Sequence, residues 1–267
     1  MPPSRYPNSA TPATFGRSRW RPALAHVAAS ALVAGVGTFV LVQLWYPSPY
    51  AVLAGGLRLL MILIAVDVVL GPALTFVVAS PNKRMRVLAG DLAVILAVQV
   101  GALGYGLYAL AIVRPIGLVF EIRQMRVVTA ADVDSASVAK APAELRALSW
   151  SGPRLMAVDK PTDPSELFQS IQLGMAGVDL GMQPMYWRPY GRARREAAWK
   201  AARTAALLIE RRREADVQVA AAAVAAGLKV DQVRFLPLRA RNADGWVTLL
   251  AAPDARVIGH INQDGDF

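Results

Sequence analysis

The sequence holds few of the residue types that perform acid–base or metal chemistry. It contains no cysteine, which excludes disulfides, thiolate catalysis and cysteine-based metal sites. Its two histidines, His26 and His260, are 234 positions apart and do not form a recognisable metal-binding pair. No H-E-x-x-H, P-loop or G-x-S-x-G motif is present. We therefore expect a protein that is not an enzyme, with no catalytic residues, no metal site and no cofactor.

The acids of the C-terminal half are scattered through sequence that resembles loops. Such positions are more typical of helix caps and turns than of a catalytic set. The run Asp264-Gly265-Asp266 lacks the longer acidic repeat and the bidentate glutamate of a calcium loop. The scattered acids are Asp132, Asp134, Asp159, Asp163 and Asp179.

Asp67 is the most informative polar residue, because it lies in the middle of a long apolar run. An ionised carboxylate at the centre of a membrane helix costs at least ~2.5–3.5 kcal/mol. Gly71 follows at i+4 and Thr75 at i+8, so the three residues form a narrow polar and small stripe on one helix face. Pro72 removes one backbone N–H and predicts a kink.

A second face of small residues lies in the next apolar run, where Ala97, Gly101 and Gly104 recur at i, i+4 and i+7. Small residues let membrane helices approach closely, and polar side chains then hydrogen-bond across the contact. Gln99 lies at a depth comparable to Asp67 but on another face. It is a candidate partner for that carboxyl.

Three interpretations of these faces stay open. Asp67 and Thr75 hold the protein's own helices together, or the faces receive a helix from a partner protein, or they line a proton or ion path. A path normally shows more than one buried ionisable group. The helix-docking hypothesis assigns partner binding to Asp67, Gly71, Pro72, Thr75, Ala97, Gly101 and Gly104.

Three hydrophobic segments must position these residues. The chain has 267 residues and is 55% apolar, and its apolar excess lies in the blocks 24–44, 57–78 and 92–113. Each block meets the ~20-residue length needed to cross a bilayer. The first is interpreted as a retained anchor, because only five residues of this block, Leu24–Ala28, precede the small triplet Ala29-Ser30-Ala31, too few for the apolar region of a signal peptide.

The distribution of charge predicts the orientation. The net charge is +10, and residues 1–113 hold eight Lys or Arg against two acids. Basic residues precede the first span and lie between the second and third, which places these segments in the cytoplasm. We expect a basic, disordered cytoplasmic tail at 1–22, a three-helix transmembrane domain at 23–113 and a periplasmic domain at 114–267, in a bacterial inner membrane. The charge therefore sets orientation in the lipid bilayer, and no nucleic acid partner is expected.

The periplasmic segment alternates between strand and helix patterns. Strands are predicted at 116–122, 124–129, 155–158, 233–238, 246–251 and 256–262. Helices are predicted at 164–173, capped by Asp163, at 192–213 and at 215–226, which ends at Gly227. This order predicts an α+β domain with a small, mainly antiparallel sheet and helices on one face.

Several short motifs resemble those of a known family. They are Trp45-Tyr46-Pro47, Gly55-Gly56-Leu57, the run Asp67–Thr75, Asp91–Ile95, Tyr105–Tyr108, Arg114-Pro115, Val119-Phe120-Glu121, the run Arg126–Asp134, Asp179-Leu180-Gly181 and Phe235–Leu238. Over about residues 20–267 the chain resembles the type IV pilin accessory proteins of the TfpX/TfpZ type.

The resemblance implies an inner-membrane, chaperone-like protein that assists the stability of a cognate type IV pilin, major or minor, and the assembly of the pilus. Other pilus assembly components are further expected partners. It implies no catalytic residues. The alternative that we weigh is a membrane-anchored sensor or regulatory subunit whose periplasmic domain binds a ligand.

Overall fold

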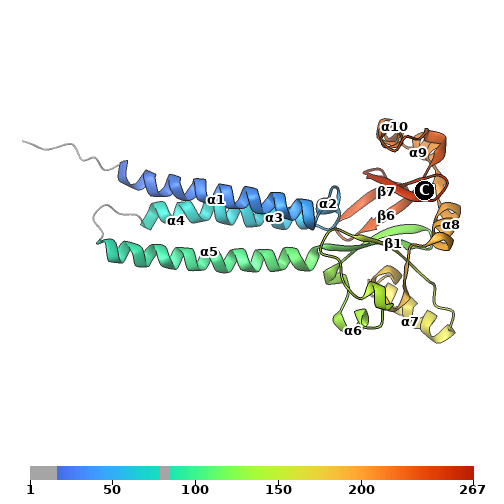
Figure 1. The fold of residues 1–267 in the computed structure, drawn as a ribbon, viewed down its shortest axis with the longest axis horizontal. Coiled ribbons are helices and arrows are strands. Elements are labelled where there is room, and N and C mark those ends of the chain that lie inside the picture. Colours follow the sequence, from blue (N-terminus) through green and yellow to red (C-terminus); the bar gives the residue numbers. More distant parts are fainter. Residues whose placement is uncertain (1–16, 79–83) are drawn as a thin grey trace, which may run out of the picture. The chain divides into compact units, whose positions relative to one another are not determined.

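The computed structural model describes residues 17–78 and 84–267 (Figure 1). Most of the tail predicted at 1–22 lies outside the described residues, as does most of the basic connector between the second and third predicted spans. All predictions about those segments stay predictions.

Three helical segments are long and apolar enough to cross a membrane: Leu24–Leu44, Gly56–Val78 and Ala89–Val113. The first belongs to helix α1 (Arg17–Leu44) and the third to α5 (Met85–Val113). The second is built from α3 (Gly56–Ala65), a π-helical turn η1 (Val66–Leu70) and α4 (Gly71–Val78). The predicted irregularity near Pro72 thus takes the form of a π turn that ends just before Gly71.

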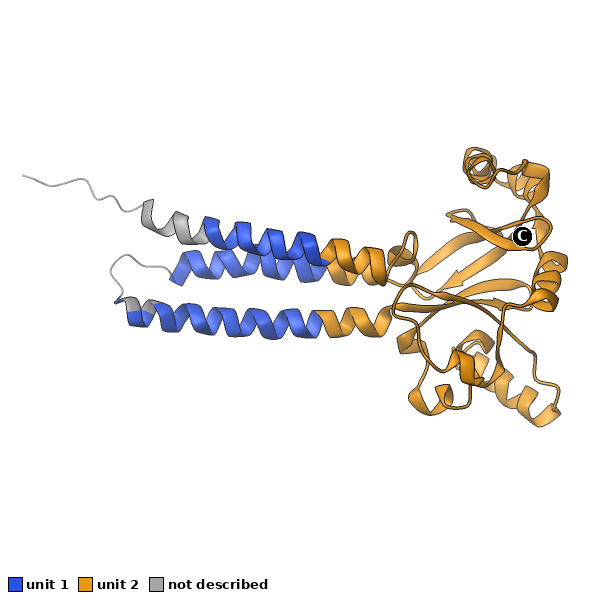
Figure 2. Ribbon diagram, viewed as in Figure 1, with its two compact units in different colours: residues 1–37, 61–106 blue, residues 38–60, 107–267 orange. Residues whose placement is uncertain are grey.

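The chain forms two compact units (Figure 2). One holds α1 up to Gly37 together with Met61–Gly106. The other holds Thr38–Leu60 and Leu107–Phe267. The second unit therefore contains the connector between the first two candidate spans as well as the C-terminal domain. Its tight turn begins with α2 (Tyr50–Leu53).

The C-terminal domain is built on an eight-stranded sheet in the order β4-β3-β1-β2-β6-β7-β8, with β5 paired to β6. The pairs β1/β3 and β2/β6 are parallel, and the others are antiparallel. The predicted small, mainly antiparallel sheet is therefore wrong, and the sheet is mixed. The reason is that β2 ends beside the start of β1, and residues 130–153 cross this end of the sheet past β1, so that β3 starts beside β1 and runs in the same direction. The strands are β1 (Pro115–Glu121), β2 (Gln124–Thr129), β3 (Arg154–Val158), β4 (Trp187–Pro189), β5 (Arg203–Thr204), β6 (Val233–Ala240), β7 (Ala243–Ala251) and β8 (Arg256–Ile261).

The sheet curls, and both of its faces are covered, which corrects the expectation of helices on one face (Figure 1). Alternate residues of each strand point to opposite faces. Leu118, Leu236 and Leu250 point to the inner face, which is covered by α2 and α8 (Arg192–Ala201). The outer face packs on short turns beside α6 (Ser135–Val138) and α7 (Pro164–Met175) at β1–β3, and on α9 (Ala205–Arg211) and α10 (Ala215–Ala225) at β6–β8.

The helix predicted at 192–213 is two helices, so that prediction is wrong. Helix α8 ends at Ala201, Ala202 is extended, and Arg203–Thr204 pairs with β6 before α9 begins. The sequence hides this break, because alanine favours helix and no glycine or proline marks it. Ala202 packs in the inner-face core while Ala205 packs on the outer face, so the break lets one chain segment serve both cores.

The connector between the first two candidate spans is part of the core of the C-terminal domain. Leu53 is fully buried and Tyr50 nearly so, both among strand residues of the inner face. The Tyr46 hydroxyl donates to the Leu110 carbonyl at 2.6 Å, which joins the end of α1 to the end of α5. Tyr46 and Tyr50 are both buried within this unit.

Gly55 and Gly56 make the tight turn of this connector possible. Gly55 has a φ of +78°, a conformation that glycine adopts at no steric cost, and a Cβ there would lie 2.6 Å from the Asn242 side-chain nitrogen. A Cβ on Gly56 would lie 2.4 Å from the ring of Tyr46. Asn242, in the turn between β6 and β7, donates to the Ala54 carbonyl at 3.1 Å.

His260 of β8 fastens the connector to the sheet. Its Nε2 lies 2.8 Å from the Tyr50 hydroxyl, and its Nδ1 lies 3.0 Å from the Thr248 hydroxyl. Burial lowers the pKa of His260 to about 4, because a charged imidazolium is poorly solvated there. The side chain is therefore neutral at physiological pH.

This burial predicts a pH-dependent stability. The unfolded chain binds a proton at His260 below its ordinary pKa of 6.5, whereas the folded protein resists protonation down to about pH 4. Stability is therefore full above pH 6.5 and falls between pH 6.5 and 4, by up to about 3 kcal/mol. Thermal unfolding of the detergent-solubilised protein, followed by tryptophan fluorescence, measures this slope.

The control is His260→Gln, which keeps a hydrogen-bonding side chain but does not titrate. We expect its stability to be nearly flat over the same window. The exposed carboxyls with lowered pKa, Asp134, Asp163 and Asp264, contribute only as the pH falls toward and below the ordinary value of 3.8. Equal slopes in the two proteins between pH 6.5 and 5 would contradict this assignment.

Candidate functional site

The structure divides the partner-binding residues predicted from the sequence into three sets. Gly71, Pro72 and Thr75 are buried within the first unit. The Thr75 hydroxyl lies 2.7 Å from His26 Nδ1 on α1 and donates to the Gly71 carbonyl at 3.0 Å. A Cβ on Gly71 would lie 1.9 Å from the side-chain nitrogen of Gln99 on α5. This face is therefore occupied by the protein's own helices.

Ala97, Gly101 and Gly104 lie on an exposed face of α5, and the structure does not bring them together with Gly71 and Thr75. A Cβ built on Gly101 or Gly104 meets nothing within 4 Å among the described residues. Tyr105 and Tyr108 continue this face and expose 75% and 63% of their surface. We call Ala97, Gly101, Gly104 and Tyr108 the α5 face. It has the small residues that close helix packing requires, and no described residue packs against Gly101 or Gly104.

Asp67 lies in the π turn and is half-buried. Gln99, which the sequence made a candidate partner for it, packs instead against Gly71. No hydrogen bond or ion pair joins Asp67 to another residue of the part of the chain that the structure describes. A π turn of this kind is frequent at functional sites, because it displaces a side chain from its regular helical position.

Motifs from distant parts of the sequence meet at the end of the candidate spans. We call this cluster the collar: Trp45, Tyr46, Leu110, Arg114 and Trp150. The Arg114 guanidinium stacks 3.7 Å from the Trp150 ring centroid, and Trp150 packs against Trp45 at 5.6 Å. Arg114 also donates to the backbone carbonyls of Ala111 and Ser149. The collar fixes the start of β1 to the ends of α1 and α5, which is a structural role.

A second cluster joins three of the other motifs on the outer face of the sheet. Glu121 and Arg126 are buried, and their side chains meet at 3.1 Å. Arg126 also pairs with Asp179, and the second oxygen of Glu121 accepts from the backbone N–H of Gly181. The Trp187 indole donates to the Gly181 carbonyl at 2.7 Å. The cluster anchors the loop at 179–182 to β1 and β2, which no spacing rule in the sequence revealed.

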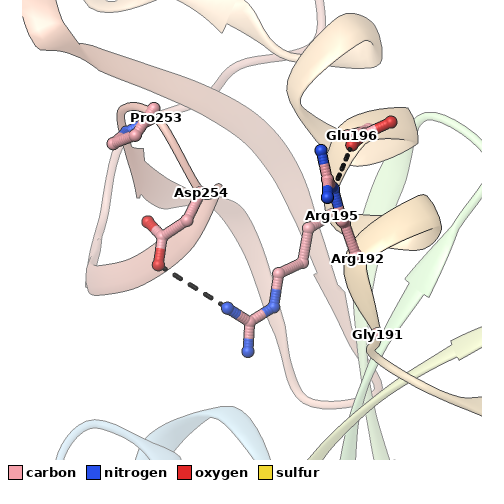
Figure 3. Close-up of a pocket in the computed structure, with 6 residues that line it drawn as sticks. All are labelled: Gly191, Arg192, Arg195, Glu196, Pro253 and Asp254. Carbon is pink, nitrogen blue, oxygen red and sulfur yellow. Dashed lines mark hydrogen bonds and ion pairs between the residues drawn. The ribbon is translucent and has the colours of Figure 1, made fainter.

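The hollow beside α8 has a volume of about 390 Å³ and is lined by Gly191, Arg192, Arg195, Glu196, Pro253 and Asp254 (Figure 3). Its charges are already paired. Arg192 contacts Glu196 at 3.0 Å and Arg195 contacts Asp254 at 3.6 Å. No nucleophile or histidine lines it. Among the described residues, no group of three His, Cys, Asp or Glu is placed to hold a metal ion.

The buried Glu121–Arg126 pair yields a stability prediction. Arg126→Met leaves the Glu121 carboxylate buried without its cation, and we expect the free energy of unfolding to fall by about 3–5 kcal/mol. The matched control is Arg192→Met, which removes an i,i+4 pair whose arginine side chain is 94% exposed. We expect less than about 0.5 kcal/mol there. Chemical denaturation of the two purified variants compares these costs, and equal costs would contradict the role of the cluster.

Comparisons with known proteins agree with the motifs. The family model described as fimbrial assembly protein FimB matches residues 15–55. The chain is 31% identical over 224 residues to the fimbrial assembly protein of serogroup I of Dichelobacter nodosus, covering 83% of this chain and 84% of that protein.

It is 30% identical over 230 residues to the serogroup E1 protein of the same organism, covering 85% and 86% of the two chains. The protein of serogroups C1 and C2 is 36% identical over 104 residues, covering 39% of this chain and 76% of that protein. No solved structure matches the chain.

The matches to the serogroup I and serogroup E1 proteins extend over most of both chains. They confirm the resemblance to a pilus-accessory family that the motifs indicated. This chain belongs to the fimbrial assembly protein family.

Proposed function

We propose that this protein is a membrane-anchored accessory protein that assists the stability and assembly of a cognate type IV pilin. Membership of the fimbrial assembly family supports a role in pilus assembly. The chaperone-like action on a pilin is our proposal, and it rests on the sequence resemblance together with the open α5 face. The proposal contains no catalytic step.

The proposed location is the bacterial inner membrane. The three apolar helices support anchoring in a membrane. We assign the N-terminus to the cytoplasm and residues 114–267 to the periplasm, because basic residues precede the first candidate span and Arg84 and Arg86 follow the second. The proposed domains are 1–22, 23–113 and 114–267. The connector 45–56 belongs by packing to the last of these.

The observation that carries the docking proposal is the difference between the two small-residue faces. The face around Gly71 is filled by Gln99, whereas Gly101 and Gly104 have open space beside them. An apolar helix in the bilayer packs closely against small residues, with van der Waals contacts and lipid release as driving forces. A pilin awaiting assembly presents such a helix, and we place it against the α5 face.

Asp67 is proposed as a second polar contact, separate from the α5 face, because its span packs against another side of α5, at Gln99 and Gly106. A carboxyl in mid-span without a partner among the described residues gains from a donor that another helix brings. We propose that Asp67 hydrogen-bonds to the pilin or to another assembly component in the membrane. Gly71, Pro72 and Thr75 support the interface indirectly, because they hold α4 against α1 and α5.

A pair of glycine variants tests this division. Gly101→Leu fills the open face with a branched side chain, and we expect pilin to be lost from detergent pull-downs while the variant accumulates in membranes at the wild-type level. Gly71→Leu drives its side chain into Gln99, and we expect lower accumulation and faster proteolysis of the variant itself. Quantitative immunoblotting of membranes and pull-downs measures both.

The opposite result would contradict pilin docking at the α5 face. If Gly101→Leu binds pilin as the wild type does, the helix docks elsewhere. Leu96→Phe serves as a control, because Leu96 is 61% exposed on α5 but lies about 140° around the helix from Gly101. We expect that variant to retain pilin binding.

A further inference from the structure

Helix α7 turns its apolar side outward. Phe168, Ile171 and Met175 recur at i, i+3 and i+7 and expose 64%, 54% and 80% of their surface. The side that faces the domain carries Ser170, which is buried, and Gly174. A surface helix of a soluble domain normally does the reverse. We call Phe168, Ile171 and Met175 the α7 ridge.

The helix is nevertheless well defined by its own contacts. The Asp163 carboxylate accepts from the backbone N–H groups of Ser165 and Glu166 at 2.9 and 3.0 Å, which confirms the predicted cap. At the other end, the Gln183 side chain donates to the carbonyls of Ser170 and Val178. These contacts hold α7 in place, so the exposure of the ridge is a property of the folded domain.

A groove adjoins the other side of α7. It has a volume of about 460 Å³ and is lined, among others, by Leu173, Met182, Met185 and Tyr186. Tyr186 is largely buried and forms part of the groove lining. Methionine side chains adapt to varied apolar partners. Ridge and groove together make an interaction surface.

The charges around this surface indicate what occupies it. Residues 161–187 contain three acids and no Lys or Arg, in a chain of net charge +10. Asp179 is paired with Arg126, which leaves Asp163 and Glu166 exposed on the groove side of α7, near Tyr186. A helix that binds anionic lipid carries basic residues beside its apolar side, and α7 has none. The groove is also lined by Asp132, Asp134 and Lys140, so two copies of this surface would bring together more acids than bases.

We infer that the α7 ridge and its groove bind the soluble part of a pilin subunit, through an apolar patch bordered by Lys or Arg. This inference rests on the proposed function and adds a second contact, in the C-terminal domain, to the one proposed at the α5 face. An exposed apolar patch with a polar border is the usual form of a protein–protein site.

Photocrosslinking tests the surface in the full-length protein. A photoreactive residue replaces Phe168, and in a control it replaces Val217, which is 77% exposed on α10. The experiment uses native membranes from pilin-producing cells, with adducts identified by mass spectrometry. We expect a pilin adduct from position 168 at a yield at least about tenfold above that from position 217. Adducts to lipid only, or to a second copy only, would overturn the inference.

Paired variants give an independent measure. Phe168→Ser with Ile171→Ser removes two apolar contacts, and we expect pilin recovery to fall about tenfold or more. Glu166→Lys reverses the border charge, and we expect a smaller fall that high salt reduces. Val217→Ser with Val224→Ser is the matched control, since both valines are more than 75% exposed on α10. All of these positions are exposed, so accumulation of the protein should be unchanged.

The outcomes separate this inference from the proposed function. If the wild type recovers pilin and the ridge variant recovers as much, the ridge is wrong while pilin binding stands. If the wild type recovers no pilin, both are overturned. If pilin is recovered and only the ridge variant and Gly101→Leu lose it, both contacts are supported.

Discussion

The burial of one short connector is the constraint on which the C-terminal domain depends. Leu53 and Tyr50 occupy the inner core of the curled sheet, and Tyr46 bonds to the end of α5. The ends of the candidate spans are therefore part of the core that folds around them. The glycine pair and Asn242 serve this arrangement, as does the neutral His260. Any account of the domain as a separate module appended to a membrane anchor misses this shared core.

Contacts between distant segments also explain why the motifs are spread over the chain. Residues 45–56 and the arginine at 114 meet in the collar and connector, while Glu121, Arg126 and Asp179 meet on the outer face. These clusters fix geometry and are satisfied within the protein. Three other features have no packing or hydrogen-bond partner among residues 17–78 and 84–267: the Asp67 carboxyl, the open side of Gly101 and Gly104 on α5, and the outward apolar ridge on α7. The motif residues in these clusters stabilise the fold. The groups without a partner among the described residues are the candidates for binding another protein.

The sequence predicted the local elements well, because apolar length, caps and turns are local signals. The three long apolar helical segments, the Asp163 cap and the end of the last helix at Gly227 are confirmed. The sequence-based predictions failed where contacts between distant segments determine the structure. The parallel pairing of β1 with β3 and the strand inserted at Arg203 depend on partners far along the chain. The small-residue pattern found both helix faces, but periodicity alone does not tell which face the protein's own helices fill. The apolar residues of α7 follow the i, i+3, i+7 spacing that normally marks the buried side of a helix. The sequence therefore did not reveal that this side is exposed.

The most direct test of the central claim is site-specific photocrosslinking from Gly101 and from Gly71 in native membranes of cells that make pilin. Our account predicts a pilin adduct from position 101, on the open face of α5, and only contacts with the protein's own helices from position 71. A pilin adduct from position 71, or lipid and self-contacts alone from position 101, would contradict it and return the search for the pilin contact to the C-terminal domain.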